Sequence, residues 1–189
     1  MADPVFTDSY IGVGGGLCFC VADDPGMHSS QNEQDSRHYA KASKIAMLEP
    51  ADSSECKEFT KYAFTLSEEF DTPVFIRLST RVSHSQSLVE LGERKEAGVK
   101  DYEKNIGKFV MMPANAIKRH PIVEERQKAI ADYAETCGLN IVEKGSSKLG
   151  IITAGTSYNY AKEVFGENAS YLKLGIVNPL PVNLIKDFA

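Results

Sequence analysis

The first 86 residues alternate between continuous apolar runs and one periodic apolar segment. Residues 16–22, GLCFCVA, lie between GVGGG and DDPG, which predicts a central strand of a parallel sheet covered on both faces. A shorter run, KIAML, follows at 44–48, and TPVFIRLST at 72–80 predicts the next strand. Strand, helix and strand in this order predict a βαβ unit. The helix is expected between the two later runs, where one face repeats at three- and four-residue steps: Cys56, Phe59, Ala63, Leu66 and Phe70.

The start of this helix has its own sequence signal. Asp52 stands at the expected N-cap and Glu55 follows three residues later, as in a capping box. Pro50 lies just outside the helix. We therefore expect the helix to begin directly after Asp52.

The second half of the chain begins with a charged segment. Residues 87–108 are rich in charge and glycine and poor in apolar residues, which predicts a connector over the surface. A helix is expected over 120–140, with Pro121 near its first turn and Gly138 as its C-cap. The remaining elements are expected in the order strand 149–155, helix 156–166, strand 171–177 and a new helix within NPLPVNLIKDF.

Composition narrows the class of protein. With 189 residues, of which 42% are hydrophobic, the chain can form one substantial domain or two small ones. The formal net charge is −5 and the basic residues are scattered, which argues against nucleic acid as a partner. No apolar run approaches the ~18 residues that span a membrane, and MADPVFTDSY has no signal-peptide pattern. We expect a soluble cytoplasmic protein without a membrane partner.

The four cysteines are too scattered for a disulfide framework and too few for an iron–sulfur array. Cys18 and Cys20 would share one face of the first strand. Because free cysteine is among the most buried residue types, we expect packing thiols rather than metal or redox groups. The other two are Cys56 and Cys137.

A dense polar stretch, ADDPGMHSSQNEQDSRHYA, occupies residues 22–40 directly after the first strand. In parallel α/β sheets, ligands bind beyond the carboxyl ends of the strands. DDPG alone is an ordinary turn sequence, but the three side-chain amides and one carboxylate of residues 31–34 exceed what a turn needs. A metal site is one reading, although no known ligand spacing matches. Acid–base chemistry by His28 or Glu33 is a second, and a recognition loop lining a polar cofactor or substrate is a third. The candidate metal ligands are Asp23, Asp24, His28, Glu33, Asp35 and His38.

Three other segments have polar groups at expected strand ends. GVGGG at 12–16 precedes a strand rather than a helix, so a tight turn is favoured over a phosphate loop. RLSTRVSHS at 77–85 brings Arg77, Arg81 and His84 to the same sheet edge. An arginine there either holds a carboxylate bidentately as a binding group, or is simply solvated or salt-bridged. TAGTSYNYAKE at 153–163 offers either an anion site at a helix N-terminus or simple capping by Thr156 or Ser157.

The order of several segments adds a family resemblance. GLCFCVADDPGMHSSQNEQDSRHYAKASKIAMLEP, EEFDTPVFIRLSTRVSHS, FVMMPANAIKRHPIVEERQKAIADYAE, LGIITAGTSYNYAKEVFG and LKLGIVNPLPVNLIKDF together resemble the alpha subunit of indolepyruvate ferredoxin oxidoreductases. The resemblance covers nearly the whole chain, and DDPGMHSSQNEQDSR is its most specific part.

The resemblance implies an α/β fold in three parts. Residues 1–86 would form the later part of a thiamine-pyrimidine-binding-type domain with a parallel sheet. Residues 87–147 would form a charged connector and helix, and 148–189 the beginning of a transketolase-C-like α/β domain. The loop from Asp23 to Arg37 would border the thiamine and substrate pocket. Candidate cofactor-binding or substrate-pocket residues are His28, Ser29, Ser30, Gln31, Asn32, Glu33, Arg37 and Arg81, with no catalytic residue and no metal ligand assigned.

The resemblance also implies an activity. Such enzymes use thiamine diphosphate with Mg²⁺ to decarboxylate arylpyruvates oxidatively, form aryl-acetyl-CoA and reduce ferredoxin through iron–sulfur clusters. The implied partners are the beta subunit, the remaining alpha-subunit domains, ferredoxin and CoA. The family's acidic activator, its diphosphate-binding domain and its cysteine-rich tail have no matching positions here. We therefore expect the chain alone to be inactive, to bind no cofactor tightly, and to self-associate through uncovered apolar surface. The alternative is a stand-alone binding or subunit-interaction module.

Overall fold

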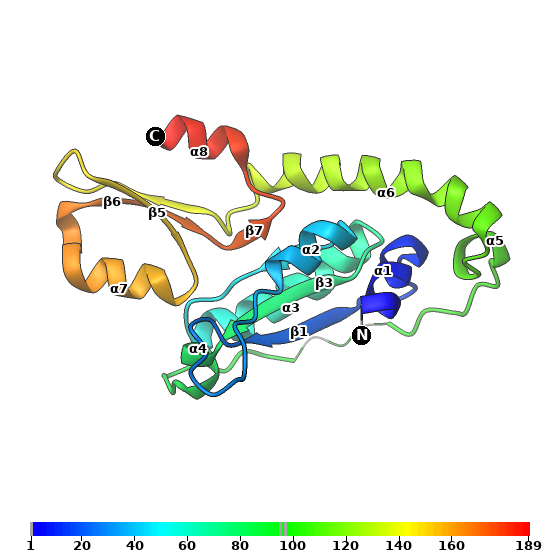
Figure 1. Cartoon of the computed structure of the whole chain (residues 1–189), viewed down its shortest axis with the longest axis horizontal. Coiled ribbons are helices and arrows are strands. Elements are labelled where there is room, and N and C mark those ends of the chain that lie inside the picture. Colours follow the sequence, from blue (N-terminus) through cyan, green and yellow to red (C-terminus); the bar gives the residue numbers. More distant parts are fainter. Residues whose placement is uncertain (1, 95, 97) are drawn as a thin grey trace.

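The computed structural model describes residues 2–94, 96 and 98–189. Within this part the chain forms two β-sheets, and a long helix, α6, runs beside the first of them (Figure 1). The strand order is β1-β3-β2-β7 in the first sheet and β4-β6-β5 in the second. The expected mixed α/β fold with a parallel sheet is confirmed.

The first sheet contains the predicted βαβ unit. Its three parallel strands are β1, β3 and β2, and β7 adds an antiparallel strand beside β2. Chain segments more than 120 residues apart in sequence thus share one sheet. The strands are β1 (Cys18–Asp23), β2 (Ala46–Leu48), β3 (Val74–Ser79) and β7 (Ile176–Asn178).

Helices cover both faces of this sheet. On one face, α3 (Ser53–Glu69) and α6 (Pro113–Ala134) enclose a core with β2, β3 and β7. On the other face, α1 (Ala2–Ile11) and α2 (Arg37–Ser43) pack on a smaller cluster around Phe75. The predicted apolar face of α3 is confirmed by the three side chains that are fully buried there, Phe59, Ala63 and Leu66.

The N-terminus of α3 is capped as predicted at Asp52. Its carboxylate accepts a hydrogen bond of 2.9 Å from the backbone N–H of Glu55. The Glu55 carboxylate in turn accepts from the N–H of Ala51 at 2.8 Å, one residue before the N–H of a standard capping box. Two backbone donors that have no partner within the helix are therefore satisfied.

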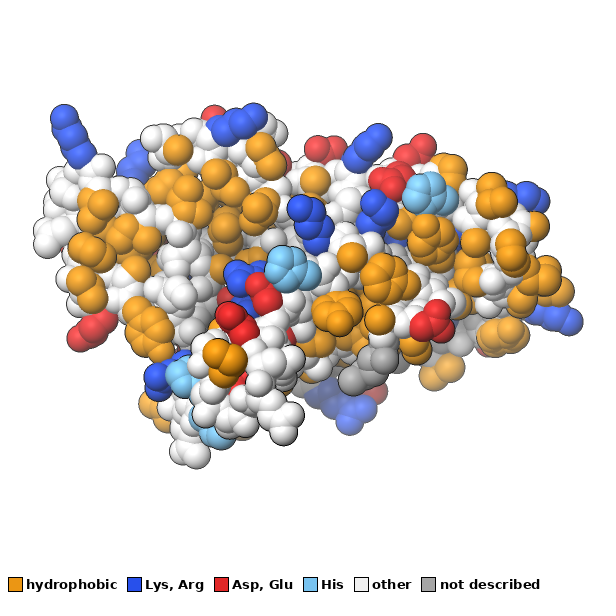
Figure 2. Space-filling model, viewed as in Figure 1, with side chains coloured by type: hydrophobic (Ala, Val, Ile, Leu, Met, Phe, Trp, Pro, Cys, Tyr) orange, Lys and Arg blue, Asp and Glu red, His pale blue; other side chains and the backbone are white. Residues whose placement is uncertain are grey.

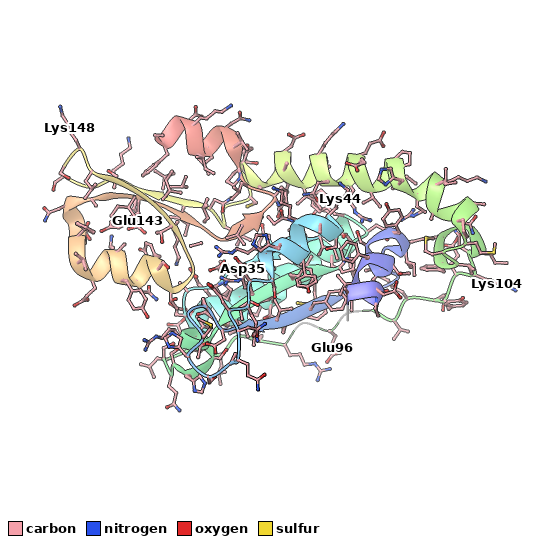
Figure 3. The ribbon with its side chains drawn as sticks, viewed as in Figure 1. Asp35, Lys44, Glu96, Lys104, Glu143 and Lys148 are labelled. Atoms are coloured by element: carbon pink, nitrogen blue, oxygen red, sulfur yellow. The ribbon has the colours of Figure 1, made fainter. Side chains whose placement is uncertain are left out.

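The second sheet consists of three strands and is partly covered by helices. Its strands are β4 (Ile141–Glu143), β6 (Ser170–Leu174) and β5 (Gly150–Ala154). The central strand, β6, is antiparallel to β4 and parallel to β5. The helix α7 (Thr156–Phe165) is tied to this sheet by Glu143, which accepts hydrogen bonds from Tyr158 and Lys162 (Figure 3). A 3₁₀ turn (Gly166–Asn168) follows α7, and α8 (Val182–Phe188) ends the chain. Hydrophobic side chains gather over this sheet and α8 in Figure 2. The large hydrophobic residues that are exposed in β4, β5 and α8 are Ile141, Val142, Ile152 and Val182.

The bounds predicted for α6 were wrong at both ends. The helix begins at Pro113, seven residues before the expected start, so Pro113 and not Pro121 occupies the first turn. Pro121 lies inside the helix. The helix ends at Ala134, and Gly138, although its φ is 77°, lies in the turn beyond the cap residue Glu135. Burial of one helix face, including Val123 and Ile130, outweighs the usual exclusion of proline from helix interiors.

Two predictions about strands also need correction. β1 is an edge strand of the described sheet, not a central one, and Cys20 on it is exposed. The expected burial of the thiols is therefore wrong for Cys20, while the other three cysteines are half-buried. The single strand predicted over 171–177 is interrupted at Gly175, so that β6 and β7 belong to different sheets. A Cβ at Gly175 would stand 2.5 Å from the carbonyl oxygen of Leu139.

The remaining elements are short. α4 (Thr80–His84) follows β3 directly, and α5 (Ile106–Phe109) precedes α6. The described residues between 85 and 105 form neither helix nor strand and are largely exposed. No helix in the described part of the chain is both long and apolar enough to cross a membrane.

Candidate functional site

Polar side chains follow each of the three parallel strands at the carboxyl edge of the first sheet. The register pairs Asp23 at the end of β1 with Ser79 at the end of β3. Asp24 comes directly after β1, Glu49 directly after β2, and Thr80 directly after β3. Because the strands are parallel, these groups meet at one edge, which is the usual ligand-binding edge of an α/β sheet.

A buried arginine connects the strand ends. Arg77 on β3 is 4% exposed; its Nε donates to Asp23 at 2.5 Å and its Nη1 donates to Glu49 at 2.9 Å. Asp23 also accepts hydrogen bonds from the backbone N–H and the hydroxyl of Ser36, at 2.8 and 2.5 Å. Arg77 is therefore a salt-bridged arginine and not a free binding group. Through Asp23 and Ser36, it fixes the C-terminal end of the polar loop.

Glu49 is the least satisfied member of this network. Its Oε2 is buried and makes no hydrogen bond with any described residue. Burial raises the pKa of Glu49, and the charges of Arg77 and Arg37 offset part of that rise. Gly155 lies against this carboxylate, because a Cβ at Gly155 would stand 2.7 Å from Glu49 Oε1. The junction between β5 and α7 therefore packs against the end of β2.

Asp24 fixes the near end of the polar loop. Its carboxylate accepts from the backbone N–H groups of Ser29 and Ser30 at 2.8 and 2.9 Å, and from the Thr80 hydroxyl at 2.5 Å. The Thr80 hydroxyl and the Ser29 amide hold the pKa of Asp24 well below its usual range. A carboxylate in this setting stays ionised and acts as a structural acceptor.

Arg37 is engaged in a local ion pair. Its Nε and Nη2 donate to the two carboxylate oxygens of Asp35, both at 2.8 Å. The hydrogen bond from Arg37 lowers the pKa of Asp35 to about 2. A bidentate pair of this kind uses two of the guanidinium donors that would otherwise bind an anion.

Between its two fixed ends the loop presents free side chains. The backbone of Ser29 and Ser30 is held by Asp24, yet His28, Gln31 and Glu33 are exposed and their side chains form no hydrogen bond with described residues. The Asn32 side chain accepts one long hydrogen bond, of 3.4 Å, from Gln34. The loop is thus a fixed frame with unengaged polar groups.

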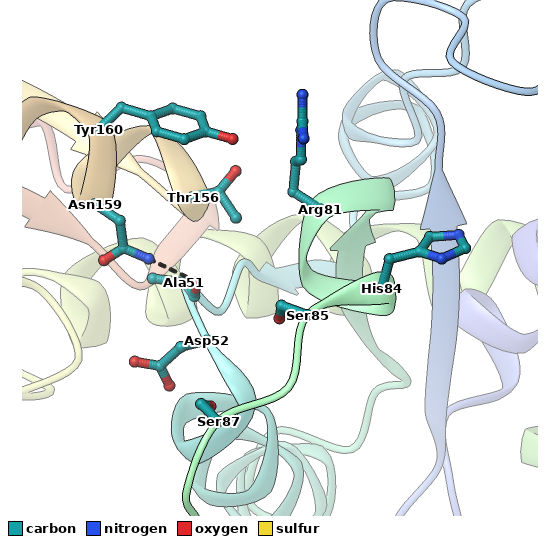
Figure 4. Close-up of a pocket in the computed structure, with 9 residues that line it drawn as sticks. All are labelled: Ala51, Asp52, Arg81, His84, Ser85, Ser87, Thr156, Asn159 and Tyr160. Atoms are coloured by element: carbon teal, nitrogen blue, oxygen red, sulfur yellow. Dashed lines mark hydrogen bonds between the residues drawn. The ribbon is translucent and has the colours of Figure 1, made fainter.

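A cavity of about 320 Å³ brings together three segments that are distant in sequence. It adjoins a second cavity of about 420 Å³, which shares Arg81, Thr156 and Tyr160 (Figure 4). The His84 ring, by contrast, points away from the Arg81 guanidinium (Figure 4). Of the eight residues predicted from the sequence, only two line these cavities, His28 and Arg81. The first cavity is lined by Pro25, His28, Ser79, Thr80, Arg81, Thr156, Ser157 and Tyr160.

The α7 wall of the cavity was only partly foreseen. The N-cap of α7 is Gly155, with φ 53° and ψ −145°, and no side chain caps the helix. The capping reading for Thr156 and Ser157 was therefore wrong, and both residues line the cavity instead. Tyr160 was missed. Its position one turn after Thr156 on a helix that starts at a strand end is the signal that would have found it.

The described residues offer no site for a metal ion made of three or more His, Cys, Asp or Glu side chains. The carboxylates of the polar stretch are instead used within the protein, Asp23 by Arg77 and Asp24 by the loop amides. The local surface therefore consists mainly of neutral donors and acceptors, with the exposed Glu33 carboxylate on the loop and the Arg81 guanidinium, which has no partner among the described residues.

Comparison with known proteins gives these observations a context. No family model matches the sequence. The chain is 42% identical over 192 residues to indolepyruvate oxidoreductase subunit IorA of Archaeoglobus fulgidus. It is 42% and 43% identical to the IorA subunits of Methanothermobacter marburgensis and Thermococcus kodakarensis. The chain is homologous to one segment of IorA. In each case the match covers 99% of this chain but 31% of the relative, so the chain spans about a third of the length of the IorA subunits.

A solved structure supports the fold. The chain superimposes with a TM-score of 0.62 on a 2-oxoglutarate:ferredoxin oxidoreductase from Magnetococcus marinus, a structure with 2-oxoglutarate, coenzyme A and succinyl-CoA bound. The match covers 98% of this chain and 41% of that chain. At 14% identity it shows that this chain and the matched part of that enzyme share a fold.

Proposed function

We propose that the chain supplies one wall of the active site of an indolepyruvate ferredoxin oxidoreductase. The proposed reaction is the oxidative decarboxylation of arylpyruvates such as indolepyruvate, which yields aryl-acetyl-CoA and reduced ferredoxin. The observation that carries the proposal is the 42% identity to IorA across 99% of the chain. The polar groups gathered at the carboxyl edge of the first sheet are in keeping with such a role.

The proposed wall is the loop from Asp23 to Arg37 together with Arg81. The contacts to thiamine or substrate would come from the loop side chains that are unengaged in the fold, above all His28 and Gln31. The loop backbone is already held by Asp24 at one end and, at the other, by Asp23, which is paired with Arg77. Binding therefore orders few further groups and costs less entropy. The other proposed contact residues are Ser29, Ser30, Asn32 and Glu33. Arg37 would contact a ligand only with the guanidinium donors that its pair with Asp35 leaves free.

Thiamine diphosphate with Mg²⁺ would supply the nucleophilic ylid and the electron sink when bound. The amide and hydroxyl donors of the loop suit the polar edge of such a group. No set of three metal-ligating side chains is found among the described residues, so the proposal assigns Mg²⁺ no ligand in this chain. The chain's part is to position the substrate and to keep water from it.

The remaining machinery is assigned to other polypeptide segments. The iron–sulfur clusters, the ferredoxin contact and the diphosphate-binding domain would lie in the rest of the alpha subunit and in the beta subunit. Within this chain we propose the pyrimidine-binding-type domain at 1–86, the connector and helix at 87–147, and the start of a transketolase-C-like domain at 148–189. A cytoplasmic location stays a prediction.

The test is purification of the tagged chain from its own cells, without added partners. We expect it to copurify with polypeptides that contain thiamine diphosphate and iron–sulfur clusters. The preparation should reduce ferredoxin or a low-potential dye only when indolepyruvate and CoA are both present. A native preparation that contains the chain at full occupancy and lacks this activity would contradict the proposal.

The alternative, a stand-alone binding module, predicts a different result. In that case the chain would purify without large partners and turn over no 2-oxoacid. A second readout within the active preparation is the variant His28→Ala, which should raise KM for indolepyruvate more than it lowers kcat, because His28 would contribute to binding. Lys148→Ala changes an exposed residue in the turn before β5. It is the matched control and should alter neither KM nor kcat.

A further inference from the structure

Arg81 is a charged group that the fold does not use. Arg77, four residues earlier, is buried between two carboxylates, and Arg37 is paired with Asp35. No ion pair or hydrogen bond links the Arg81 guanidinium to another described residue. Instead, the side chain rises from α4 beside α7, and the Tyr160 hydroxyl points toward it (Figure 4).

The surroundings of Arg81 are suited to a negatively charged oxygen group. Among the described residues that line the 320 Å³ cavity there is no carboxylate. The lining contains Arg81, His28 and five hydroxyl groups. The Thr80 hydroxyl donates to Asp24, and the other four hydroxyls can donate a hydrogen bond to a ligand. Asp52 lines only the adjoining cavity, and its carboxylate is occupied as the N-cap of α3.

The first turn of α7 adds two further features. Its backbone N–H groups have no side-chain cap, since Gly155 occupies the N-cap, and they carry the partial positive charge of a helix start. Gly155 also brings this turn close to the sheet, because any Cβ there would collide with Glu49. The cavity volume lies at the lower end of the ~300–1,000 Å³ range of small-molecule sites.

We propose that this cavity is a subsite for an oxyanion group of a small ligand, with Arg81 as its charged anchor. The oxyanion is the carboxylate of a 2-oxoacid or a phosphate of a phosphorylated cofactor. Arg81 would bind two of its oxygens, and the hydroxyls of Thr156 and Tyr160 would bind from α7. The identification of the oxyanion as a 2-oxoacid carboxylate rests on the function proposed above. The proposal that the cavity binds an oxyanion does not.

The test uses the 189-residue chain and calorimetry at low ionic strength. The probes are inorganic pyrophosphate, phenylpyruvate and, as an uncharged control, phenylpyruvate methyl ester. We expect at least one charged probe to bind in the millimolar range or more tightly, and the ester to bind more weakly. Tighter binding of phenylpyruvate identifies the carboxylate as the source, and tighter binding of pyrophosphate identifies the phosphate.

Matched variants decide whether Arg81 is the anchor. Arg81→Gln should weaken binding of the charged probe about tenfold or more, since it removes a charge-assisted pair of hydrogen bonds. Arg94→Gln removes the same charge from a side chain that is 84% exposed on the connector, and should leave binding within about twofold of the unmodified chain. Tyr160→Phe, which removes only the hydroxyl, should cause a smaller loss than Arg81→Gln.

The variant Arg81→Gln is expected to fold normally, because Arg81 holds no other described residue. An unchanged urea midpoint therefore accompanies the loss of binding. The proposal is overturned if neither charged probe binds at millimolar concentrations, if Arg81→Gln binds as well as the unmodified chain, or if Arg94→Gln loses as much. These outcomes concern the isolated chain and are independent of whether the native assembly oxidises indolepyruvate.

Discussion

Arg77 is the residue on which the geometry of the polar loop depends most. It lies between Asp23 and Glu49, and all three side chains are largely buried. Removing one partner of such a group leaves an uncompensated charge in the interior, which costs far more than the pair contributes. The arrangement fixes the positions of two strand ends and, through Ser36, the start of α2.

We predict that Arg77→Met lowers the free energy of unfolding by about 3–5 kcal/mol, because two buried carboxylates lose their cation. Urea unfolding followed by circular dichroism measures this change. Arg94→Met is the matched control on the surface and should cost less than about 0.5 kcal/mol. A loss below about 1 kcal/mol in Arg77→Met would mean that water reaches the two carboxylates and that the network is not a fixed frame.

Gly155 and Gly166 allow backbone strain to be separated from steric contact. Both have φ of 53°, with ψ of −145° and −131°, a region occupied almost only by glycine. A Cβ at Gly155 would meet Glu49, whereas a Cβ at Gly166 meets nothing within 4 Å. An alanine would therefore suffer the same backbone strain at both positions, but a steric collision only at position 155.

We predict that Gly166→Ala costs about 1–3 kcal/mol from strain alone, and that Gly155→Ala costs clearly more. Thermal unfolding of the two variants gives the comparison. Gly155→Ala should also weaken oxyanion binding, since it pushes the first turn of α7 away from the sheet. Equal losses of stability in the two variants would show that the junction between β5 and α7 is not packed against Glu49.

At the scale of elements, patterns with a local cause were predictable. The three-and-four-residue period identified α3 because its buried face is set by the helix repeat alone. The split of 171–177 into β6 and β7 was not predictable, since it depends on the close approach of Leu139 to Gly175. The edge position of β1 likewise depends on which strands pair, and its sequence is as apolar as that of a central strand.

The residues of the candidate site also divide into those that the sequence predicts and those that only the fold reveals. His28 and Arg81 were predictable because each follows a recognisable strand at its carboxyl end. The engagement of Arg37 by Asp35 and of Arg77 by Glu49 was not, since the sequence does not show which charges are close in space. Tyr160 lies about 130 residues from the loop in the chain, and only the fold brings it to the same cavity.

Pro121 gives a prediction for a single element. It lies inside α6, where it removes one backbone hydrogen bond. We predict that Pro121→Ala raises the free energy of unfolding by about 1–3 kcal/mol, measured by urea unfolding. Pro113→Ala is the control, because proline is well tolerated in the first turn of a helix, and it should change stability by less than about 0.5 kcal/mol. A destabilised Pro121→Ala variant would indicate that α6 requires a bend at this position.

At the scale of the molecule, contacts across the first sheet join segments from both ends of the chain. β7 pairs with β2, and Arg126 of α6 donates to the carbonyl groups of Ser9 and Asp71. The Arg81 cavity lies between α4, which follows the first sheet, and α7, which covers the second. Its shape therefore depends on how these two parts are held together.

This arrangement leads to a prediction about the cofactor. The described residues place a polar wall beside the first sheet but no group of metal ligands, and Mg²⁺ is normally held by carboxylates together with phosphate oxygens. We predict that calorimetry of the chain alone with thiamine diphosphate and Mg²⁺ detects no binding in the micromolar range. Weak binding through the diphosphate should disappear in Arg81→Gln, which separates the oxyanion subsite from a cofactor site. Micromolar binding that survives this substitution would show that the chain by itself holds the cofactor, and the role proposed for it would have to extend beyond one wall.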